Sequence, residues 1–352
     1  MSALRRSTLV RSLALVIVCA LVLLVVSELF SDYRNEQLSY GAYFFAVLAG
    51  LTVLAGQSGQ ISLGHGALMA VGAYTVALLV GNEGWALLPA LVAATAVALV
   101  IGIPVGVAAS RLRGPYLAGA TLAFAVGLPA LADRFPATFG GENGLTINPA
   151  TPPSFLGSNF DLVRWQAWIC CLGALVVLFV LYNLIHSGVG RSWRAVRDDE
   201  IAASLCGLHV GRMQTLAFVT SAGCAGLGGG LFTVAYQLAA PGAFQLQLSL
   251  FLLAGVVVGG LGSLGGAVWG AALLVFLPNW THDIASSVSL STNVSNNLPL
   301  AVYGVVLIAA MLLWPTGIQG AIRALTGLVR RRVVAGRQVR LGRASGAESG
   351  PR

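Results

Sequence analysis

The segment Arg191–Arg212, RSWRAVRDDEIAASLCGLHVGR, is the most densely charged part of the chain between its two ends. Apolar residues recur within it at spacings of three to five, namely Trp193, Val196, Ile201, Leu205 and Leu208. This spacing predicts a short amphipathic helix that carries these side chains on one face. Asp199 is a candidate N-cap for the helix, and Gly207 is a candidate helix stop.

Long apolar runs flank this charged segment, Ala167–Ile185 before it and Met213–Ala235 after it. Each run has about the 20 residues that an α-helix needs to cross a bilayer. The sequence therefore predicts a short helix at the membrane surface between two transmembrane helices. The charge pattern leaves two interpretations open, a docking surface for another protein and a plain topological anchor.

The composition of the whole chain supports a membrane protein. Of 352 residues, 57% are hydrophobic and only 9% are charged, whereas soluble domains carry about 25% charged residues. The apolar runs are too long for barrel strands, so the predicted fold is an all-α polytopic membrane protein with about ten transmembrane helices. The 44 glycines suit close contact between helices.

Several chemistries are excluded by what the chain lacks. All 20 basic residues are Arg, so no Walker A lysine and no Schiff-base lysine exists. The five Cys show no CxxC spacing, and the four His show no metal-ligand spacing. We therefore predict no catalytic residue, no metal site and no cofactor bound by this chain.

The net charge is +8, and the distribution of the Arg residues fits a membrane topology better than a nucleic-acid-binding surface. With Ser12–Phe30 as a retained first helix, 17 of the 20 Arg fall on one side of the predicted membrane, and Asp133–Arg164 forms a long loop on the other. The positive-inside rule then predicts that both termini are cytoplasmic. We assign 1–322 to a transmembrane domain, with a cytoplasmic loop at about 187–212, and 323–352 to a disordered Arg-rich tail.

Two uncharged, glycine-rich segments interrupt the apolar pattern, GQSGQISLGHG (Gly56–Gly66) and GGLGSLGG (Gly259–Gly266). Polar backbone at membrane depth is tolerated only where it is buried in protein or lines a cavity. The first break is either a broken helix beside a translocation pathway or an ordinary turn between two helices. The similar motifs SLGHGA and SLGGA indicate a weak internal repeat around such a pathway. His65 alone is interpreted as a hydrogen-bonded structural residue, not as a ligand.

Five motifs together resemble a known family: GQSGQISLGHGALMAVGAY (Gly56–Tyr74), RGPYLAGATLAF (Arg113–Phe124), FGGENGL (Phe139–Leu145), GRSWRAVRDDEIAASLCGL (Gly190–Leu208) and GVVVGGLGSLGGAVWGAAL (Gly255–Leu273). They look like the permease of branched-chain amino acid importers, in particular the M-type subunit of the leucine/isoleucine/valine system. The resemblance covers about Ser39–Thr316 in unbroken order.

This resemblance implies a subunit of an ATP-binding-cassette (ABC) importer in the bacterial plasma (inner) membrane. Its implied partners are a second, H-type permease, two cytoplasmic ATPases and a soluble substrate-binding protein. ATP and Mg²⁺ would be used by the ATPases, so this chain would not itself be an enzyme.

The resemblance also implies roles for two sets of residues. The family's E-x-A-A-x-x-x-G pattern is present here. In binding-protein-dependent importers generally the acidic residue is followed directly by the two alanines, whereas here Ile201 stands between them. The predicted ATPase-coupling residues are Arg194, Arg197, Asp198, Glu200, Ala202, Ala203 and Gly207. The predicted pathway residues are Gly56, Gln57, Gly59, Gln60, Ser62, Gly64, His65, Gly259, Gly260, Gly262 and Ser263.

The sequence leaves other substrates open and disfavours two other classes of protein. Selectivity in such importers resides largely in the binding protein, so urea, short amides or another small polar solute stay open as substrates. An ion-coupled secondary transporter is disfavoured because the interiors of the predicted spans hold no Asp, Glu or Arg. An intramembrane enzyme ranks last because no nucleophile–base pair lies in or beside a span.

Overall fold

The computed structural model describes residues 2–112, 115–153 and 160–287, and within the C-terminal part 298, 301–302, 304–305, 308–309, 312, 317–324 and 326. The predicted disordered tail over 323–352 lies almost entirely outside the described residues. The same holds for most of the last apolar run, at 300–314.

Helices account for nearly all of the described chain, as predicted. The long ones are α1 (Ser2–Leu29), α2 (Asp32–Thr52), α3 (His65–Val76), α4 (Leu87–Arg111), α5 (Pro115–Arg134), α7 (Leu162–His186), α10 (Val210–Tyr236), α11 (Leu246–Gly259) and α12 (Leu264–Ser287).

Eight stretches of the described residues are long and apolar enough to cross a membrane. Two of them join an α-helix to a π-helix, η1 (Val53–Gln57) after α2 and η2 (Ala77–Asn82) after α3. A further stretch, Leu264–Trp280 in α12, is also apolar but shorter. About ten spans were expected, and the described residues contain these nine, so the all-α polytopic class is confirmed.

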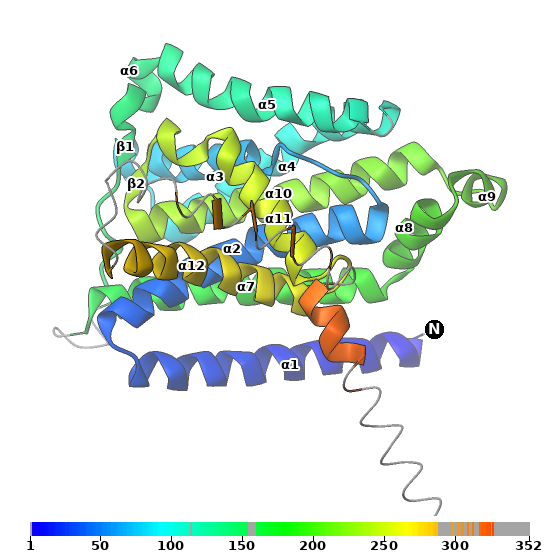
Figure 1. The fold of residues 1–352 in the computed structure, drawn as a ribbon, viewed down its shortest axis with the longest axis horizontal. Coiled ribbons are helices and arrows are strands. Elements are labelled where there is room, and N and C mark those ends of the chain that lie inside the picture. The colour runs from blue at the N-terminus through cyan, green and yellow to red at the C-terminus, as the bar shows by residue number, and fades with distance from the viewer. Residues whose placement is uncertain are drawn as a thin grey trace, which may run out of the picture.

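Short elements gather at the two ends of the helix bundle (Figure 1). At one end lie α8 (Gly188–Asp198), α9 (Glu200–Leu205) and the start of α1. At the other lie α6 (Pro136–Phe139), the 3₁₀ turns η3 (Gly141–Asn143) and η5 (Pro241–Phe244), and the strands β1 (Leu145–Thr146) and β2 (Leu238–Ala239). The strands pair antiparallel, with Leu145 opposite Ala239. We call these the α8–α9 end and the β1–β2 end.

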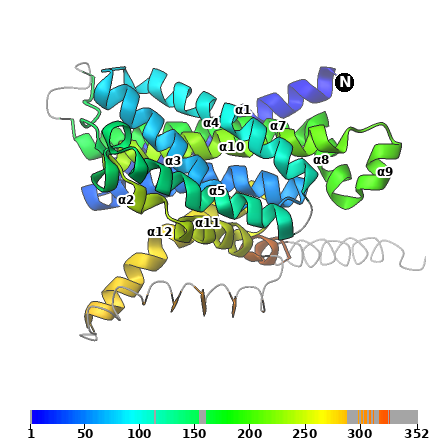
Figure 2. The ribbon, with the colours of Figure 1, turned by 90° about the horizontal axis from the view of Figure 1, so that it is seen from above.

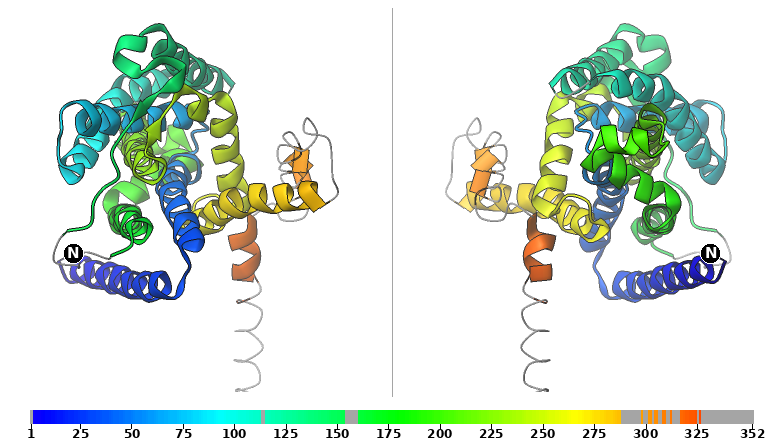
Figure 3. Two further views of the ribbon diagram at one scale, coloured as in Figure 1. Left: turned by 90° about the vertical axis from the view of Figure 1, so that its left-hand side faces the viewer. Right: turned by 90° about the vertical axis from the view of Figure 1, so that its right-hand side faces the viewer.

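Helix α10 lies at the centre and packs against α2, α3, α4 and α7. Within its membrane-length window 78% of the residues are buried, because glycines let neighbouring backbones approach it closely. A Cβ added at Gly226 would overlap Ala98 of α4, and one at Gly229 would overlap the backbone of Met69 in α3. Helices α1 and α5 lie on opposite sides of α10 in Figure 1, and α12 projects from the body in Figures 2 and 3.

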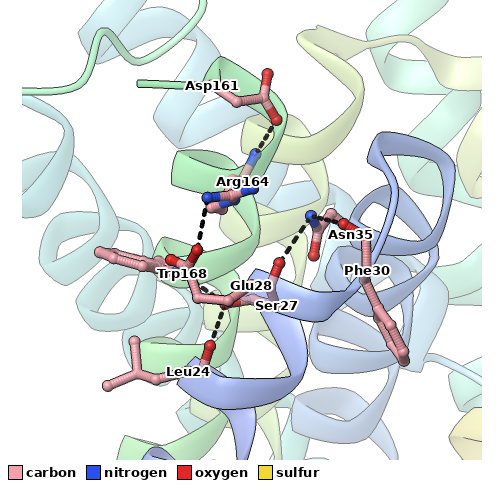
Figure 4. A network of polar contacts seen from close by, with 8 residues as sticks. All are labelled: Leu24, Ser27, Glu28, Phe30, Asn35, Asp161, Arg164 and Trp168. Carbon is pink, nitrogen blue, oxygen red and sulfur yellow. Dashed lines mark hydrogen bonds and ion pairs between the residues drawn. The ribbon is translucent and has the colours of Figure 1, made fainter. Parts of the chain in front are cut away.

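Helix α1 is the most peripheral span, because only 6% of its window is buried and its main neighbour is α7. Polar contacts fasten its C-terminal end near the β1–β2 end (Figure 4). Trp168 donates its indole N–H to Ser27 Oγ at 2.9 Å, and Arg164 pairs with Glu28 at 2.9 Å. Asn35 at the start of α2 donates to the Ser27 carbonyl at 3.2 Å, which fixes the turn between α1 and α2.

Candidate functional site

The charged segment folds as two helices, not one. Ser187 caps α8 by accepting a hydrogen bond from the backbone N–H of Val189 at 3.1 Å. Trp193 and Val196 are buried, and the Trp193 indole donates to the Met213 carbonyl at 2.9 Å. Helix α8 is therefore amphipathic, as predicted, and its apolar face packs against the first turn of α10.

Asp199 ends α8 and starts α9. Its backbone is extended, and its side chain accepts hydrogen bonds from the N–H groups of Ile201 at 2.8 Å and Ala202 at 3.0 Å. The predicted N-cap is thus confirmed. Gly207 follows α9 with a φ of 83°, in the left-handed conformation that suits a helix stop, as was also predicted.

The prediction of one continuous apolar face is wrong. Ile201 is 74% exposed and Leu205 is 83% exposed, whereas Trp193 and Val196 are buried. The physical reason is the extended residue Asp199, which breaks the helical register and points α9 in a new direction.

Helix α9 is held to the rest of the chain by its other face. Ala203 is 4% exposed, so it packs inside this chain and does not belong to the free surface of α9. Glu200 accepts a hydrogen bond from Gln214 of α10 at 2.8 Å. Among the predicted coupling residues, Ala202 and Gly207 are exposed, and no heavy atom lies within 4 Å of the position that a Cβ on Gly207 would take.

The first glycine break is non-helical chain whose polar side chains are buried, whereas Gly59 and Ile61 are exposed. After η1 and Ser58, residues 59–64 leave the helical conformation, Gly59 has a φ of 75°, and α3 begins at His65. Gln57, Ser58, Gln60 and Ser62 are each 5% exposed or less. Burial of these polar groups within protein is what the broken-helix interpretation requires, and the exposed Gly59 and Ile61 place part of the break at the surface of this chain.

The break reaches deep into the bundle. His65 Nε2 lies 2.7 Å from Ser221 Oγ, and its Nδ1 lies 3.2 Å from Ser62 Oγ. Ser221 is 11 residues beyond the start of α10 at Val210, which is about 16 Å along this helix of 27 residues. Both ring nitrogens of His65 have a partner, as its structural interpretation predicted.

The second glycine break lies between α11 and α12. Gly260 and Gly262 have φ values of 120° and 81°, which an L-residue with a side chain rarely adopts. Ser263 Oγ accepts a hydrogen bond from the Gly266 N–H at 3.3 Å at the start of α12. Gly259 packs against Gly266, where a Cβ would overlap the Gly266 carbonyl group.

The two breaks touch each other, although about 200 residues separate them. Gln57 Nε2 donates to the Gly262 carbonyl at 2.9 Å. A Cβ added at Gly56 would overlap the backbone N and Cα atoms of Gly262, so the two backbones are in direct contact. We call the contact of Gly56 and Gln57 with Gly262 the break junction.

Two arginines of α8 bind the same junction. Arg194 donates to Gln57 Oε1 at 3.0 Å, and Arg197 donates to the Gly56 carbonyl at 2.6 Å. Arg197 also pairs with the exposed Asp198 at 2.7 Å. In the second break, Arg323 donates to Ser263 Oγ at 3.0 Å. The structure therefore brings residues predicted for coupling and residues predicted for the pathway into one cluster at the α8–α9 end.

Not all predicted pathway residues join this cluster. Gly64 and His65 lie deeper, where the N–H of Leu63 donates to Thr121 Oγ1 of α5 at 3.0 Å. The N–H of Gly66 donates to Ser249 Oγ of α11 at 3.0 Å. Thr121, Ser221 and Ser249 were not predicted, because each is a hydroxyl residue within an apolar helix and its burial is visible only in the structure.

The site holds no recognisable metal centre within the part of the chain that is described. No three His, Cys, Asp or Glu side chains there lie close enough together to hold an ion. The chemistry of the cluster is that of backbone carbonyls, amides and guanidinium groups, which fix positions and do not transfer protons or electrons.

Comparisons with known proteins place this chain among transport proteins. Residues 38–311 match the family described as "Branched-chain amino acid transport system / permease component". The chain is 36% identical over 253 residues to the high-affinity branched-chain amino acid transport system permease protein LivM of Escherichia coli K12, covering 64% of this chain and 58% of that protein. It therefore spans less than two thirds of that relative. Its N-terminal helix α1 precedes the family match.

More distant relatives are matched over most of their length. The chain is 27% identical over 298 residues to the permease protein LivH of E. coli K12, covering 80% of this chain and 92% of that protein. It is 24% identical to the permease protein BraD of Pseudomonas aeruginosa, with 80% and 93% covered. No solved structure matches the chain.

Proposed function

Because the chain belongs to the family of branched-chain amino acid transport system permease components, we propose that it forms part of the transmembrane pathway of an ABC importer for branched-chain amino acids. The observation that carries this proposal is the family match over 38–311, which includes both glycine breaks and both helices of the charged loop. The membrane-length helices supply the span, and the buried polar breaks supply non-helical backbone within it.

Four partner subunits complete the proposed importer. They are a second, H-type permease, two cytoplasmic ATPases and, outside the membrane, a soluble binding protein that delivers the amino acid. LivM and LivH carry the name of the same transport system, and both resemble this chain, which supports a pairing of two related permeases. The ATPases bind ATP and Mg²⁺, and this chain transmits their movement in the bacterial plasma membrane.

The proposed docking element for an ATPase is α9. Its apolar side chains Ile201 and Leu205 project from a charged loop at the α8–α9 end. Exposure of this apolar surface to water is unfavourable, and a docked partner would cover it. Its inner face, with Glu200 and Ala203, is bound to the rest of the chain, so force on the exposed face passes into α8 and α10. Each apolar side chain of this size contributes about 1.5–3 kcal/mol when it becomes fully buried.

The experiment is reconstitution of the permeases, ATPases and binding protein in liposomes, with uptake of labelled leucine as the readout. We expect ATP-dependent uptake that unlabelled isoleucine and valine inhibit and that urea and short amides do not. Leu205→Asp should weaken ATPase binding about tenfold or more, since 1.4 kcal/mol corresponds to a factor of ten. Leu205→Met and the neighbouring Cys206→Ser are the matched controls and should bind normally.

Two results would contradict the proposal. Uptake by this chain alone, driven by an ion gradient, would support a secondary transporter instead. Normal ATPase binding by Leu205→Asp would show that α9 is only a topological anchor.

A further inference from the structure

Gln57 occupies a position that joins three separate elements. Its Oε1 atom accepts a hydrogen bond from Arg194 of α8, and its Nε2 atom donates to the carbonyl of Gly262 between α11 and α12. Its own backbone closes the π-helix η1 at the end of α2. One side chain thus connects the charged loop with both glycine breaks.

A glutamine suits this position because its amide both accepts and donates hydrogen bonds. The side chain is 5% exposed, so its two contacts are made where water competes poorly. A carboxylate at the same place would keep the contact with Arg194 but would present an acceptor to the Gly262 carbonyl. A shorter or apolar side chain would leave Arg194 and that carbonyl without this partner.

At the break junction the backbones of Gly56 and Gly262 are in direct contact. No side chain separates them, so movement of either segment toward the other would displace it. Arg197 binds the Gly56 carbonyl directly, and its Cγ lies against Gly59. Helix α8 therefore contacts the first break at Gly56, Gln57 and Gly59, and Gly56 and Gln57 in turn contact Gly262 of the second break.

From this arrangement, and on the basis of the proposed function, we infer that Gln57 is the positioning residue through which movement of α8 reaches the second glycine break. The break junction is then the part of the pathway that the ATPases move. Gln57 acts on the substrate only through Gly262 and need not touch it.

The test compares two buried glutamines of the same break. Gln60 donates to the Gln214 carbonyl of α10 at 3.0 Å and to Ser58 Oγ at 2.8 Å, and neither of these partners lies in the second break. Gln57→Ala and Gln60→Ala therefore remove the same chemical group from similar surroundings. Gln57→Glu is a nearly isosteric variant that replaces the donor with an acceptor oxygen and adds a negative charge beside Arg194.

The measurement is substrate imported per ATP hydrolysed in the reconstituted importer, together with ATPase binding and basal hydrolysis. In Gln57→Ala and Gln57→Glu we expect the import ratio to fall about tenfold while ATPase binding and basal hydrolysis stay within about twofold of the wild type. Gln60→Ala should keep most of the ratio. Arg194→Gln in α8 should also lower the import ratio. The double variant with Gln57→Ala should lower the ratio little further, because both substitutions remove the same Arg194–Gln57 contact.

The inference is overturned if Gln57→Glu imports as much per ATP as the wild type, or if Gln57→Ala and Gln60→Ala lower the ratio equally. If the Gln57 variants do not reach the membrane, Arg194→Gln decides the question alone, and a normal import ratio in that variant overturns the inference. A wild-type complex without substrate-stimulated hydrolysis would instead contradict the proposed function.

Discussion

At position 72, α3 approaches α10 so closely that a Cβ would overlap the carbonyl group of Gly226. Both residues lie in helices with ordinary backbone angles, so the need for glycine here comes from contact and not from conformation. Such contacts give transmembrane helices the close van der Waals packing that the hydrophobic effect does not provide within lipid.

We predict that Gly72→Ala lowers the free energy of unfolding by about 1–3 kcal/mol, the usual cost of overpacking a fitted contact. The measurement is thermal unfolding of the purified protein in detergent. Gly127→Ala in α5 is the control, because no heavy atom lies within 4 Å of the added Cβ and alanine favours a helix. Equal melting temperatures for the two variants would show that the α3–α10 contact yields without cost.

Single residues also mark the limit of what local sequence reveals. The pattern around His65 predicted a satisfied histidine in a polar break, and the structure agrees. The partner Ser221 was not predictable, since it lies 156 residues away in a helix whose hydroxyl groups resemble any others. The meeting of Gln57 with Gly262 escaped prediction for the same reason.

At the scale of elements, Asp199 decides where α8 ends and where α9 points. Its capping role follows from its place in the sequence, and the cap was predicted. The change of helix direction was not predicted, because the apolar spacing through the cap still fits one continuous helix. The exposed pair Ile201 and Leu205 could be found only from the three-dimensional structure.

We predict that Asp199→Ala destabilises α9 by about 0.5–2 kcal/mol, the cost of losing an N-cap. A helix of six residues has little stability of its own, so α9 should fray and ATPase binding should weaken several-fold. Thermal unfolding of the helix bundle should stay unchanged. Asp198→Ala is the matched control, because its exposed ion pair with Arg197 contributes only about 0–1 kcal/mol. If both variants bind the ATPase equally, the cap has no role in docking.

At the scale of the whole molecule, the α8–α9 end and the β1–β2 end should face opposite sides of the membrane. Asp199 and Asn143 are exposed at these two ends, and the asymmetric distribution of Arg predicts that Asp199 is cytoplasmic. In a variant without native Cys, a membrane-impermeant thiol reagent applied to intact cells should label Asn143→Cys and should not label Asp199→Cys. The reverse pattern would invert the topology, and with it the proposed side of ATPase docking.

Composition and hydropathy were sufficient to predict the class of the fold and most of its spans. They did not predict which helix is central, because a helix surrounded by lipid and a helix surrounded by protein have similarly apolar sequences. Leu87–Arg111 is more hydropathic than Val210–Tyr236, yet only 33% of its window is buried, against 78% for α10. The glycines of α10 allow the close packing that makes it central, but only the structure shows which neighbouring backbones lie against them.

The central place of α10 has a consequence for biogenesis. This helix is the seventh of the eight membrane-length stretches in chain order, so the ribosome releases α2, α3, α4 and α7 before the helix on which they all pack exists. Until Tyr236 has been synthesised, their small-residue faces can meet only lipid or one another. A transcript truncated before this point encodes a fragment whose transmembrane helices lack α10, the helix against which they pack. The survival of that fragment depends on the cell's quality-control proteases and chaperones.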